Sequence, residues 1–193
     1  MPPKPWKLIS SQKKEFYKIF SLRTDRACSP RTDKTYDFYI LESTDWVNVI
    51  PLTPQNEVVL IRQYRHGTRE ITLEIPGGIV EQHDSPEEAA RRELLEETGY
   101  KASEMVSLGF VHPNPAFLNN RCYTYLAKNV YKVRKQEQDE KEDIEVLVRP
   151  LGDIPELIRR EEITHALVLA AFYRFYVGDL PVDCQAPFDS KAL

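Results

Sequence analysis

Apolar runs, and stretches in which apolar and polar residues alternate, predict where the strands of this chain lie. A period of two is typical of a half-buried strand, and a short continuous apolar run is typical of a strand buried on both faces. Tyr36, Phe38 and Ile40 alternate with polar residues and indicate an edge or hairpin strand. Further strands are expected at residues 46–50, 58–61, 71–75, 105–111, 121–128 and 144–148.

Two helices are predicted in the last part of the chain. Asp153 is a preferred N-cap residue and Glu156 follows three positions later, so a helix is expected over residues 153–160. A second helix is expected over residues 163–177, where a glycine directly follows the last residue. The charged segment 132–143 is expected to be an exposed loop.

The clearest helix signal lies in the middle of the chain. Ser85 is a preferred N-cap residue, Pro86 is favoured at the first helical position, and Glu88 completes a capping box. Strong helix formers continue to Glu97, and Gly99 supplies the glycine stop. We therefore predict a helix of about three turns from Pro86 to Glu97.

This helix carries several carboxylates on one side. Glu93 and Glu97 are four residues apart, and Glu93 and Glu96 are three apart, so the three side chains project together. Like charges at these spacings repel, which costs stability unless something neutralises them. Arg92 is four residues from both Glu88 and Glu96 and is placed to pair with them. One interpretation is therefore a solvent-exposed face with salt bridges.

A metal site is the second interpretation, because of the residues that precede the helix. Pro76-Gly77-Gly78 is expected to form a tight turn after the strand at residues 71–75. A strand, a glycine turn and an acidic helix can present backbone carbonyls and carboxylates to one point. Sites made only of oxygen ligands suit hard cations such as Mg²⁺ or Mn²⁺.

The same residues resemble a known motif, the Nudix box. This box is a glycine, five residues, a glutamate, seven residues and then R-E-U-x-E-E-x-G-U, where U is a bulky apolar residue. Here Gly78, Asp84 and the run Arg92-Glu93-Leu94-Leu95-Glu96-Glu97-Thr98-Gly99-Tyr100 have this spacing. Two positions depart from the pattern, since Asp84 replaces the glutamate and Tyr100 an aliphatic residue.

The resemblance implies a fold and a domain division. Strands flanked by helices at this length fit an α/β or α+β sandwich. The Nudix fold sharpens this to a mixed β-sheet sandwiched between α-helices, here with a small N-terminal β element. The resemblance covers about residues 45–178. We expect residues 1–44 to be a dimerisation element and residues 45–193 to be the Nudix hydrolase domain.

Three features outside the box resemble the branch that hydrolyses ADP-ribose and nucleoside diphosphate sugars. They are Arg-Gln-Tyr-Arg at 62–65 followed by Leu-Glu-Ile-Pro-Gly-Gly at 73–78, His-Pro-Asn-Pro at 112–115, and the acidic segment 140–144. One feature departs from the branch: Ala116-Phe117 follow Pro115, where the branch often has glycine and then a glutamate.

The resemblance also implies roles for individual residues. Glu93 and Glu97 are expected to be the main ligands of Mg²⁺, or of Mn²⁺, with Glu96 and the carbonyl of Gly77 in support. Arg92 is expected to hold the carboxylates in place. The remaining candidates are Glu142 or Glu140 as the catalytic base, and Arg65, Glu74, Pro115 and Trp6 as substrate-binding residues.

Composition narrows the class of protein. The chain has 193 residues, of which 41% are hydrophobic, enough for one substantial core. Its formal net charge of -4 gives no global basic field of the kind that attracts nucleic acid or an anionic membrane. No apolar run reaches the roughly twenty residues that cross a bilayer. An odd set of 3 cysteines without a CxxC motif favours a reduced compartment, so a cytoplasmic location is expected.

The substrate and the assembly are open at this point. A nucleotide sugar such as ADP-ribose is the favoured substrate, and a homodimer is expected because relatives in this branch commonly form one. The alternatives are a Nudix hydrolase of another substrate, such as a dinucleoside polyphosphate or an RNA 5′ end, and a non-catalytic nucleotide-binding module. Trp46 is expected to pack in the core, and His165 to belong to the closing helix.

Overall fold

The computed structural model describes residues 2–137 and 143–178 of the chain. These residues form two compact units. The first unit contains the N-terminal residues up to Asp45 together with His112–Arg121. The second unit contains Trp46–Val111 and continues from Cys122.

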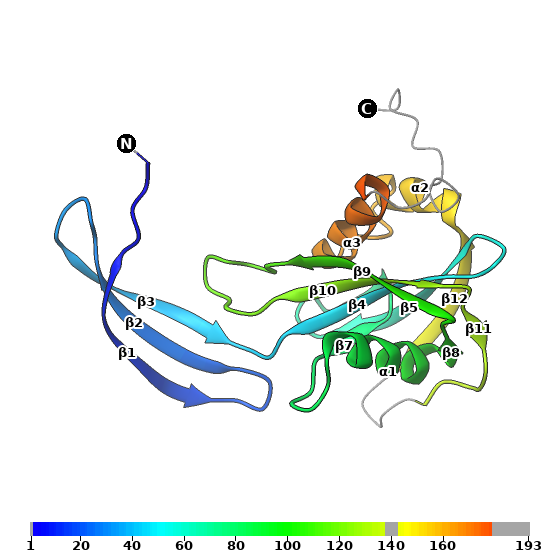
Figure 1. Ribbon diagram of the computed structural model, residues 1–193, viewed down its shortest axis with the longest axis horizontal. Coiled ribbons are helices and arrows are strands. Elements are labelled where there is room, and N and C mark those ends of the chain that lie inside the picture. Colours follow the sequence, from blue (N-terminus) through cyan, green and yellow to red (C-terminus); the bar gives the residue numbers. More distant parts are fainter. Residues whose placement is uncertain (1, 138–142, 179–193) are drawn as a thin grey trace. The chain divides into compact units, whose positions relative to one another are not determined.

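An antiparallel three-stranded sheet is the main regular structure in the described part of the first unit (Figure 1). Its strands are β1 (Lys7–Phe16), β2 (Ser21–Cys28) and β3 (Thr35–Glu42), in the order β1-β2-β3. β3 contains the strand predicted at residues 36–40, but the sequence pattern did not predict β1 and β2. Every residue of β1 is exposed, so this strand has no buried face to impose an apolar alternation. β2 is mostly half-buried, but its residues 23–26 are all polar and interrupt any such alternation.

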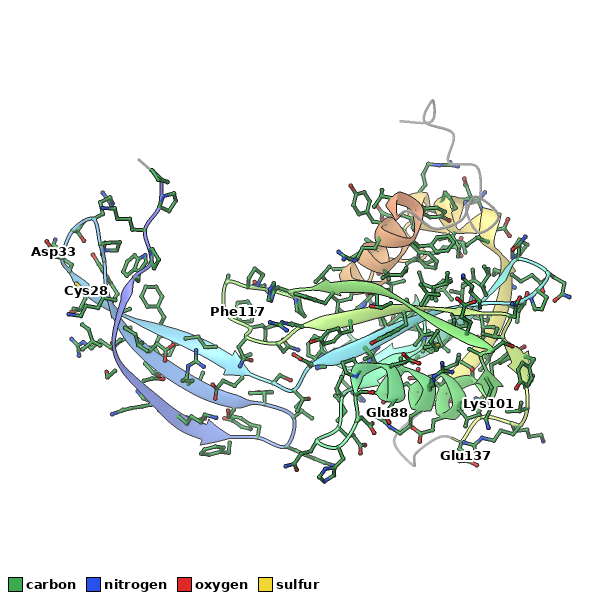
Figure 2. The ribbon with its side chains drawn as sticks, viewed as in Figure 1. Cys28, Asp33, Glu88, Lys101, Phe117 and Glu137 are labelled. Carbon is green, nitrogen blue, oxygen red and sulfur yellow. The ribbon has the colours of Figure 1, made fainter. Side chains whose placement is uncertain are left out.

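The loop at residues 112–121 is held to the end of β3 by hydrogen bonds. The backbone N–H of Leu41 donates to the carbonyl of Phe117 at 2.8 Å, and that of Ser43 donates to Asn119 Oδ1 at 3.1 Å. Phe117 is labelled in Figure 2. This loop therefore belongs to the first unit, although it connects two strands of the second.

The second unit is built on a mixed sheet that has seven strands in the described part of the chain. Five strands follow the order β12-β5-β4-β10-β9, while β6 pairs with β5 and β7 pairs with β4. β4 and β10 are parallel, and the other pairs are antiparallel. The bounds are β4 (Trp46–Leu52), β5 (Glu57–Arg65), β6 (Glu70–Glu74), β7 (Gly77–Ile79), β9 (Glu104–Val111), β10 (Cys122–Lys128) and β12 (Ile144–Pro150). A separate pair is formed by β8 (Tyr100–Lys101) and β11 (Tyr131–Lys132).

Strands β4 and β5 diverge from one another. Within the described residues, their register joins them only at Leu52 and Val58. Beyond this point β7 lies beside the first half of β4, and β6 lies beside the second half of β5. The divergence opens the sheet at the N-terminal end of β4.

Helices cover both faces of this sheet (Figure 1). On one face, Leu94 of α1 (Pro86–Thr98) shares a buried hydrophobic cluster with Val49 of β4. On the other, Phe172 of α3 (Ala166–Val177) shares a second cluster with Ile50. The short α2 (Ile154–Arg159) follows the 3-10 turn η1 (Leu151–Asp153) and lies on the same side as α3. The predicted α+β sandwich is therefore confirmed. Within the described ranges, the helices lack the combined length and apolar character that a membrane span requires.

The predicted glycine turn before α1 is wrong. The chain bends at Pro76, and Gly77 and Gly78 belong to strand β7, which pairs with β4. The glycines serve a close approach instead, because a Cβ atom on Gly78 would collide with the carboxylate of Glu93 in α1. A sequence pattern shows that glycine is present but does not show whether it serves a turn or a close contact.

Helix boundaries agree with the prediction for α1 and less well for the closing helices. Ser85 and Glu88 form both bonds of the predicted capping box. Asp153 stands at the N-cap of α2, as predicted, but its side chain forms no capping bond in this structure. α3 begins at Ala166, three residues later than predicted, with His165 as its N-cap.

Gly99 joins the end of α1 to the segment that follows β11. Its φ angle of 75° is in the left-handed region, and its N–H donates to Leu95 O at 2.9 Å. Its own carbonyl accepts the N–H of Val133 at 2.9 Å. A Cβ atom at Gly99 would collide with the backbone carbonyl of Arg134. Only glycine therefore fits both the backbone angle and the space.

Replacing Gly99 by alanine is expected to lower the free energy of unfolding by about 2 to 4 kcal/mol, because left-handed strain and overpacking add. Urea denaturation followed by circular dichroism measures this loss. Gly152→Ala is the matched control, since a Cβ atom there meets nothing within 4 Å. An equal effect of the two substitutions would contradict the steric explanation.

Candidate active site

Arg92 is the centre of the acidic side of α1. Its Nε donates to Asp84 Oδ2 at 3.1 Å, and its Nη1 donates to Glu93 Oε1 at 2.8 Å and to Glu96 Oε2 at 3.3 Å. Its Nη2 donates to the backbone carbonyl of Ile79 at 3.1 Å. One guanidinium therefore ties three carboxylates of the Nudix-like motif to strand β7. Burial alone would lower the pKa of Arg92, but Glu93 and then the other carboxylates raise it above its ordinary value.

The predicted partners of Arg92 are half right. The pair with Glu96 is present, whereas Glu88 accepts the N–H of Ser85 in the capping box instead. Asp84 pairs with Arg92 in place of Glu88. Its short side chain reaches Arg92 from the loop before the helix, which gives a structural role to the aspartate that stands where the Nudix box has glutamate.

Glu93 and Glu97 lie against the glycines of β7. Glu97 is 6% exposed, and its Oε2 accepts the N–H of Gly77 at 2.8 Å. The carboxylate of Glu93 occupies the space that a side chain on Gly78 would need. The bare backbone of β7 therefore lets two carboxylates of α1 stand beside one strand.

These residues suit a hard divalent cation by donor type. The carboxylates of Glu93, Glu96 and Glu97, with the backbone of Gly77, supply oxygen ligands of the kind that Mg²⁺ and Mn²⁺ prefer. In residues 2–137 and 143–178, no three His, Cys, Asp or Glu side chains converge in a metal-binding arrangement. The carboxylates are held by Arg92 and by the N–H of Gly77 instead.

A second charged group lies on β5 and β6. Arg65 forms a bidentate pair with Glu74, with Nε to Oε1 at 2.8 Å and Nη2 to Oε2 at 2.6 Å. Thr72 Oγ1 donates to Glu74 Oε1 at 2.6 Å. The Glu74 side chain is 3% exposed and that of Arg65 is 42% exposed. The buried Glu74 therefore binds one edge of the guanidinium, while much of the Arg65 side chain remains accessible.

The network determines the charge of Glu74. Burial on its own raises the pKa of this carboxyl, but the hydrogen bonds from Arg65 and Thr72 outweigh burial and hold the pKa below its ordinary value of 4.5. The pKa of Arg65 is raised, first by its bond to Glu74 and also by the charge of Glu97. The Arg65–Glu74 pair is therefore electrostatically coupled to the acidic face of α1.

A pocket of about 670 Å³ opens where β4 and β5 diverge. This volume is in the range of small-molecule sites. Arg65, Glu74, Gly77 and Gly78 all line it, so the pocket joins the charged pair to the glycine strand that borders Glu93 and Glu97. Other lining residues come from the start of β4, from β6, from the start of β10 and from the N-terminal end of α3, and they include Trp46, Asn48, Thr72, Cys122, Thr164 and His165.

Sequence reasoning missed Asn48 and Thr72 and assigned His165 to the closing helix only. A signal for Asn48 was available, because an amide interrupts the otherwise apolar strand Trp46–Leu52. His165 does cap α3, but it also faces the pocket. Its position depends on how α3 docks on the sheet, which no local pattern shows.

Two of the remaining predicted residues lie outside the second unit. Trp6 and Pro115 belong to the first unit. Trp6 contacts Tyr36 and Phe38 edge-on, with ring centroids 6.0 Å and 5.3 Å apart. The candidate bases Glu140 and Glu142 are outside the described residues.

The described residues on either side of the candidate bases are held by hydrogen bonds. Glu137 donates its N–H to Glu96 O of α1 at 2.9 Å. The side chain of Gln136 donates to Ile144 O at the start of β12, at 2.6 Å. Figure 2 labels Glu88 on α1 and Glu137 on the incoming segment. The chain thus leaves the described region at Glu137 in contact with the acidic helix.

Comparison with known proteins establishes the family. A family model described as "NUDIX domain" matches residues 43–172, about two thirds of the chain. The chain therefore belongs to the Nudix family, and the resemblance based on the box is confirmed.

Individual relatives point toward one branch. The chain is 31% identical over 121 residues to an ADP-ribose pyrophosphatase of Bacillus subtilis, a match that covers 62% of this chain and 65% of that protein. It thus spans slightly less than two thirds of the relative's length. An ADP-ribose pyrophosphatase of Mycobacterium tuberculosis is 26% identical over 185 residues, which cover 95% of this chain and 89% of the relative.

A solved structure shows the same fold. The crystal structure of an ADP compounds hydrolase superposes with a TM-score of 0.79 at 20% identity, over 90% of this chain and 94% of the other. At this identity the likeness supports the fold alone, and it confirms the predicted Nudix fold.

Replacing Glu74 by glutamine tests the Arg65–Glu74 pair. At pH 7 the free energy of unfolding is expected to fall by about 1 to 3 kcal/mol, because a buried charged hydrogen-bond partner is lost. Since the pKa of Glu74 is lower in the folded state, its stabilisation is complete above its ordinary value of 4.5 and is lost as the pH falls through the folded value. The difference in the free energy of unfolding between the variant and the wild type should therefore become smaller as the pH is lowered from 7 to below the pKa of Glu74 in the folded protein.

Urea denaturation at several pH values measures this difference. Glu87→Gln is the control, because Glu87 pairs only on the surface of α1 with Arg91, at 2.9 Å in an i,i+4 pair. Its effect should stay below about 0.5 kcal/mol. A difference for Glu74→Gln that does not change with pH would contradict the assignment of an ionised, paired carboxylate.

Proposed function

We propose that this protein hydrolyses the pyrophosphate bond of ADP-ribose or of a related nucleoside diphosphate sugar, giving a nucleoside monophosphate and a sugar phosphate. The observation that carries the proposal is the position of Glu93 and Glu97 beside the glycines of β7, at the edge of a pocket lined by Arg65. The named ADP-ribose pyrophosphatases among the relatives support this substrate class.

A divalent cation, Mg²⁺ or alternatively Mn²⁺, is part of the proposal. Glu93 and Glu97 are the proposed main ligands, supplemented by Glu96 and the carbonyl of Gly77. When bound, such a cation neutralises charge on the pyrophosphate oxygens and activates the attacking water. Arg92 bonds Glu93 and Glu96 and offsets their mutual repulsion, while the N–H of Gly77 holds Glu97, so the acidic face persists before the ion binds.

Arg65 is the proposed contact for the phosphates of the substrate. Its guanidinium is oriented by the bidentate bond to Glu74 and keeps 42% of its side-chain surface exposed. Because both oxygens of Glu74 already accept hydrogen bonds, we assign Glu74 as the residue that positions Arg65. A preoriented guanidinium loses little freedom on binding a phosphate.

The proposed base is Glu142, or Glu140 if the loop is shifted. Both residues lie outside the described part of the chain. Their proposed role is supported by the acidic sequence and by the bond between Glu137 N–H and Glu96 O, which brings the incoming chain to α1. A cytoplasmic location is proposed from the cysteine pattern.

A substrate panel with Mg²⁺ tests the function. It comprises ADP-ribose, GDP-mannose, other nucleotide sugars, diadenosine polyphosphates and 5′-triphosphate RNA. Selective hydrolysis of a nucleotide sugar is expected, and Glu97→Gln should lower kcat at least about 100-fold, because metal sites depend strongly on their ligands. Glu142→Gln and Glu140→Gln in the same assay identify the base as the variant with the larger loss of kcat.

Glu87→Gln provides the matched control for this panel, since Glu87 lies on α1 but pairs outward with Arg91. It should retain wild-type activity. Preference for a dinucleoside polyphosphate or RNA would move the protein to another Nudix substrate class. If metal gives no turnover on any substrate, a non-catalytic nucleotide-binding module becomes the better hypothesis.

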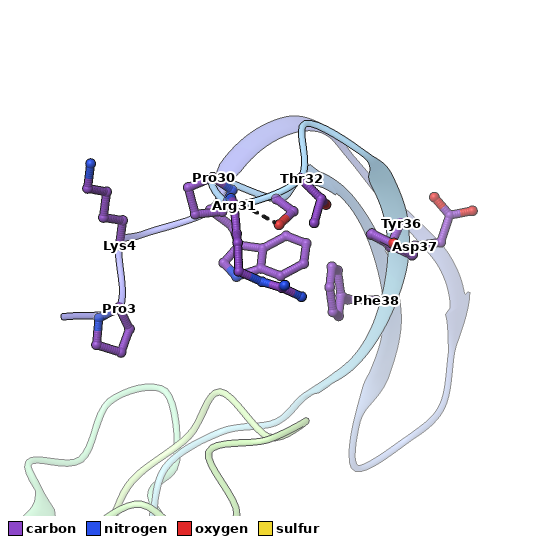
Figure 3. A pocket seen from close by; sticks show the side chains of 10 residues that line it. Pro3, Lys4, Pro30, Arg31, Thr32, Tyr36, Asp37 and Phe38 are labelled. Atoms are coloured by element: carbon purple, nitrogen blue, oxygen red, sulfur yellow. Dashed lines mark hydrogen bonds between the residues drawn. The ribbon is translucent and has the colours of Figure 1, made fainter. Parts of the chain in front are cut away.

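We also propose that the first unit mediates a homodimer. Cross-strand register places Leu8 and Tyr36 on the same face of its sheet, on either side of Ala27. Trp6 contacts Phe38 and Tyr36 edge-on, and Figure 3 labels Tyr36, Phe38 and Arg31 around the pocket that they line. These side chains remain about half exposed. An apolar cluster of this kind is typical of a protein interface.

Phe38→Asp tests the dimer. It is expected to raise the dimer dissociation constant at least about 30-fold, because it places a charge in the centre of an apolar interface. Analytical ultracentrifugation measures the constant. Tyr39→Asp is the control, since Tyr39 is 63% exposed and points to the opposite face of β3. A wild-type protein that stays monomeric at high micromolar concentration would sink this proposal.

A further inference from the structure

Asn48 is an unusual residue for its position. It lies in the middle of β4, opposite Gly77 of β7 and Thr124 of β10, and it is only 6% exposed. Its Nδ2 donates to the carbonyl of Leu167 in α3 at 3.1 Å, which determines the orientation of the amide. Its Oδ1 is buried and has no hydrogen-bond partner among the described residues. A buried amide oxygen without a donor costs stability, so this site calls for a ligand that donates a hydrogen bond.

His165 presents a second group of this kind to the same pocket. It is the N-cap of α3, but its imidazole forms no capping bond, and its buried Nδ1 has no partner in the described part of the chain. Burial, and to a lesser degree the charge of Arg65, lower the pKa of His165 more than Glu74 raises it. The ring is therefore neutral at pH 7, with one nitrogen as donor and the other as acceptor.

The two residues lie in the pocket that also contains the proposed phosphate contact. Asn48, His165 and Arg65 all line the volume of about 670 Å³. Arg65 supplies its positive charge. Asn48 offers an acceptor and His165 a neutral ring, and neither favours an anion. The pocket thus has a positively charged part at Arg65 and an uncharged polar part at Asn48 and His165. These two parts match a substrate that has charged phosphates and an uncharged sugar.

We propose that Asn48 and His165 form a hydroxyl-binding subsite that takes the sugar of the nucleoside diphosphate sugar. This inference rests on the proposed function and deepens it. A hydroxyl group both donates and accepts, so it can satisfy Asn48 Oδ1 as a donor and a ring nitrogen of His165 in either direction. Sites built to bind a hydroxyl discriminate strongly against analogues that lack it, because their own polar groups are left unpaired.

Two variants and two substrates test the subsite. The substrates are ADP-ribose and ADP esterified with tetrahydrofurfuryl alcohol, which keeps the ring of the second sugar but lacks its hydroxyls. Wild-type kcat/KM should be about 10- to 100-fold lower for the analogue. Asn48→Leu and His165→Leu should each lower kcat/KM about tenfold for ADP-ribose. The same variants should change the analogue less than about threefold, because the lost hydrogen bonds are already absent there.

Controls separate this role from a structural one. His83→Leu removes an exposed loop histidine and should match wild type on both substrates. Equal losses on ADP-ribose and on the analogue would overturn the subsite, since they would indicate a general disturbance of the pocket. A loss that disappears when adenine is replaced by hypoxanthine would also overturn it, because the occupant would then be the nucleobase.

Binding keeps the test independent of catalysis. If the wild type hydrolyses none of these substrates, the proposed function fails, and calorimetric titration of the intact protein with ADP-ribose then decides the subsite. Binding that Asn48→Leu weakens about tenfold supports it. Binding that is absent, or that the substitution leaves unchanged, overturns it.

Discussion

The close approach of strand β7 to helix α1 is the constraint on which the candidate site depends. Gly78 leaves room for the carboxylate of Glu93, and the N–H of Gly77 reaches Glu97. A Cβ atom on Gly78 would displace the carboxylate of Glu93, and a Cβ atom on Gly77 would collide with the backbone of β4 at Val47. The approach in turn concentrates negative charge, which Arg92 offsets by bonding to both the helix and the strand. The glycines and the arginine of the motif are thus parts of one electrostatic arrangement.

The same constraint explains what the sequence could predict. α1 follows from local signals, namely its capping box, its helix formers and its glycine stop, and the structure has all three. The longer strands of the second unit, β4, β5, β6, β9, β10 and β12, follow from their apolar runs and alternation, whereas the short β7, β8 and β11 carry no such pattern. β1 escaped prediction because its full exposure removes that pattern, and β2 because its central residues 23–26 are all polar. Gly77 and Gly78 were assigned to a turn because a glycine looks the same in sequence whether it bends the chain or admits a neighbour.

In the candidate site, too, local sequence signals predict some features and fail to predict others. Glu93, Glu96 and Glu97 could be grouped from helical spacing alone, since three- and four-residue steps return to one face. The pocket could not be predicted in this way. It exists because β4 and β5 diverge and α3 docks against the gap, so its lining joins residues far apart in sequence, as the bond from Asn48 to Leu167 does. Long-range docking leaves no periodic signal, although a lone amide in an apolar strand is a hint.

Charge and neutrality are arranged separately in this pocket. Arg65 is a permanent cation, and Glu74 binds one edge of its guanidinium and leaves the other edge to a ligand. His165 sits near this pair yet stays uncharged, because burial outweighs the attraction of Glu74, a charge that Arg65 already balances. The salt bridge therefore does two things at once. It orients the guanidinium of Arg65 toward the place where the phosphates are proposed to lie. It also leaves the region around His165 without net charge, and such a region suits neutral hydroxyl groups.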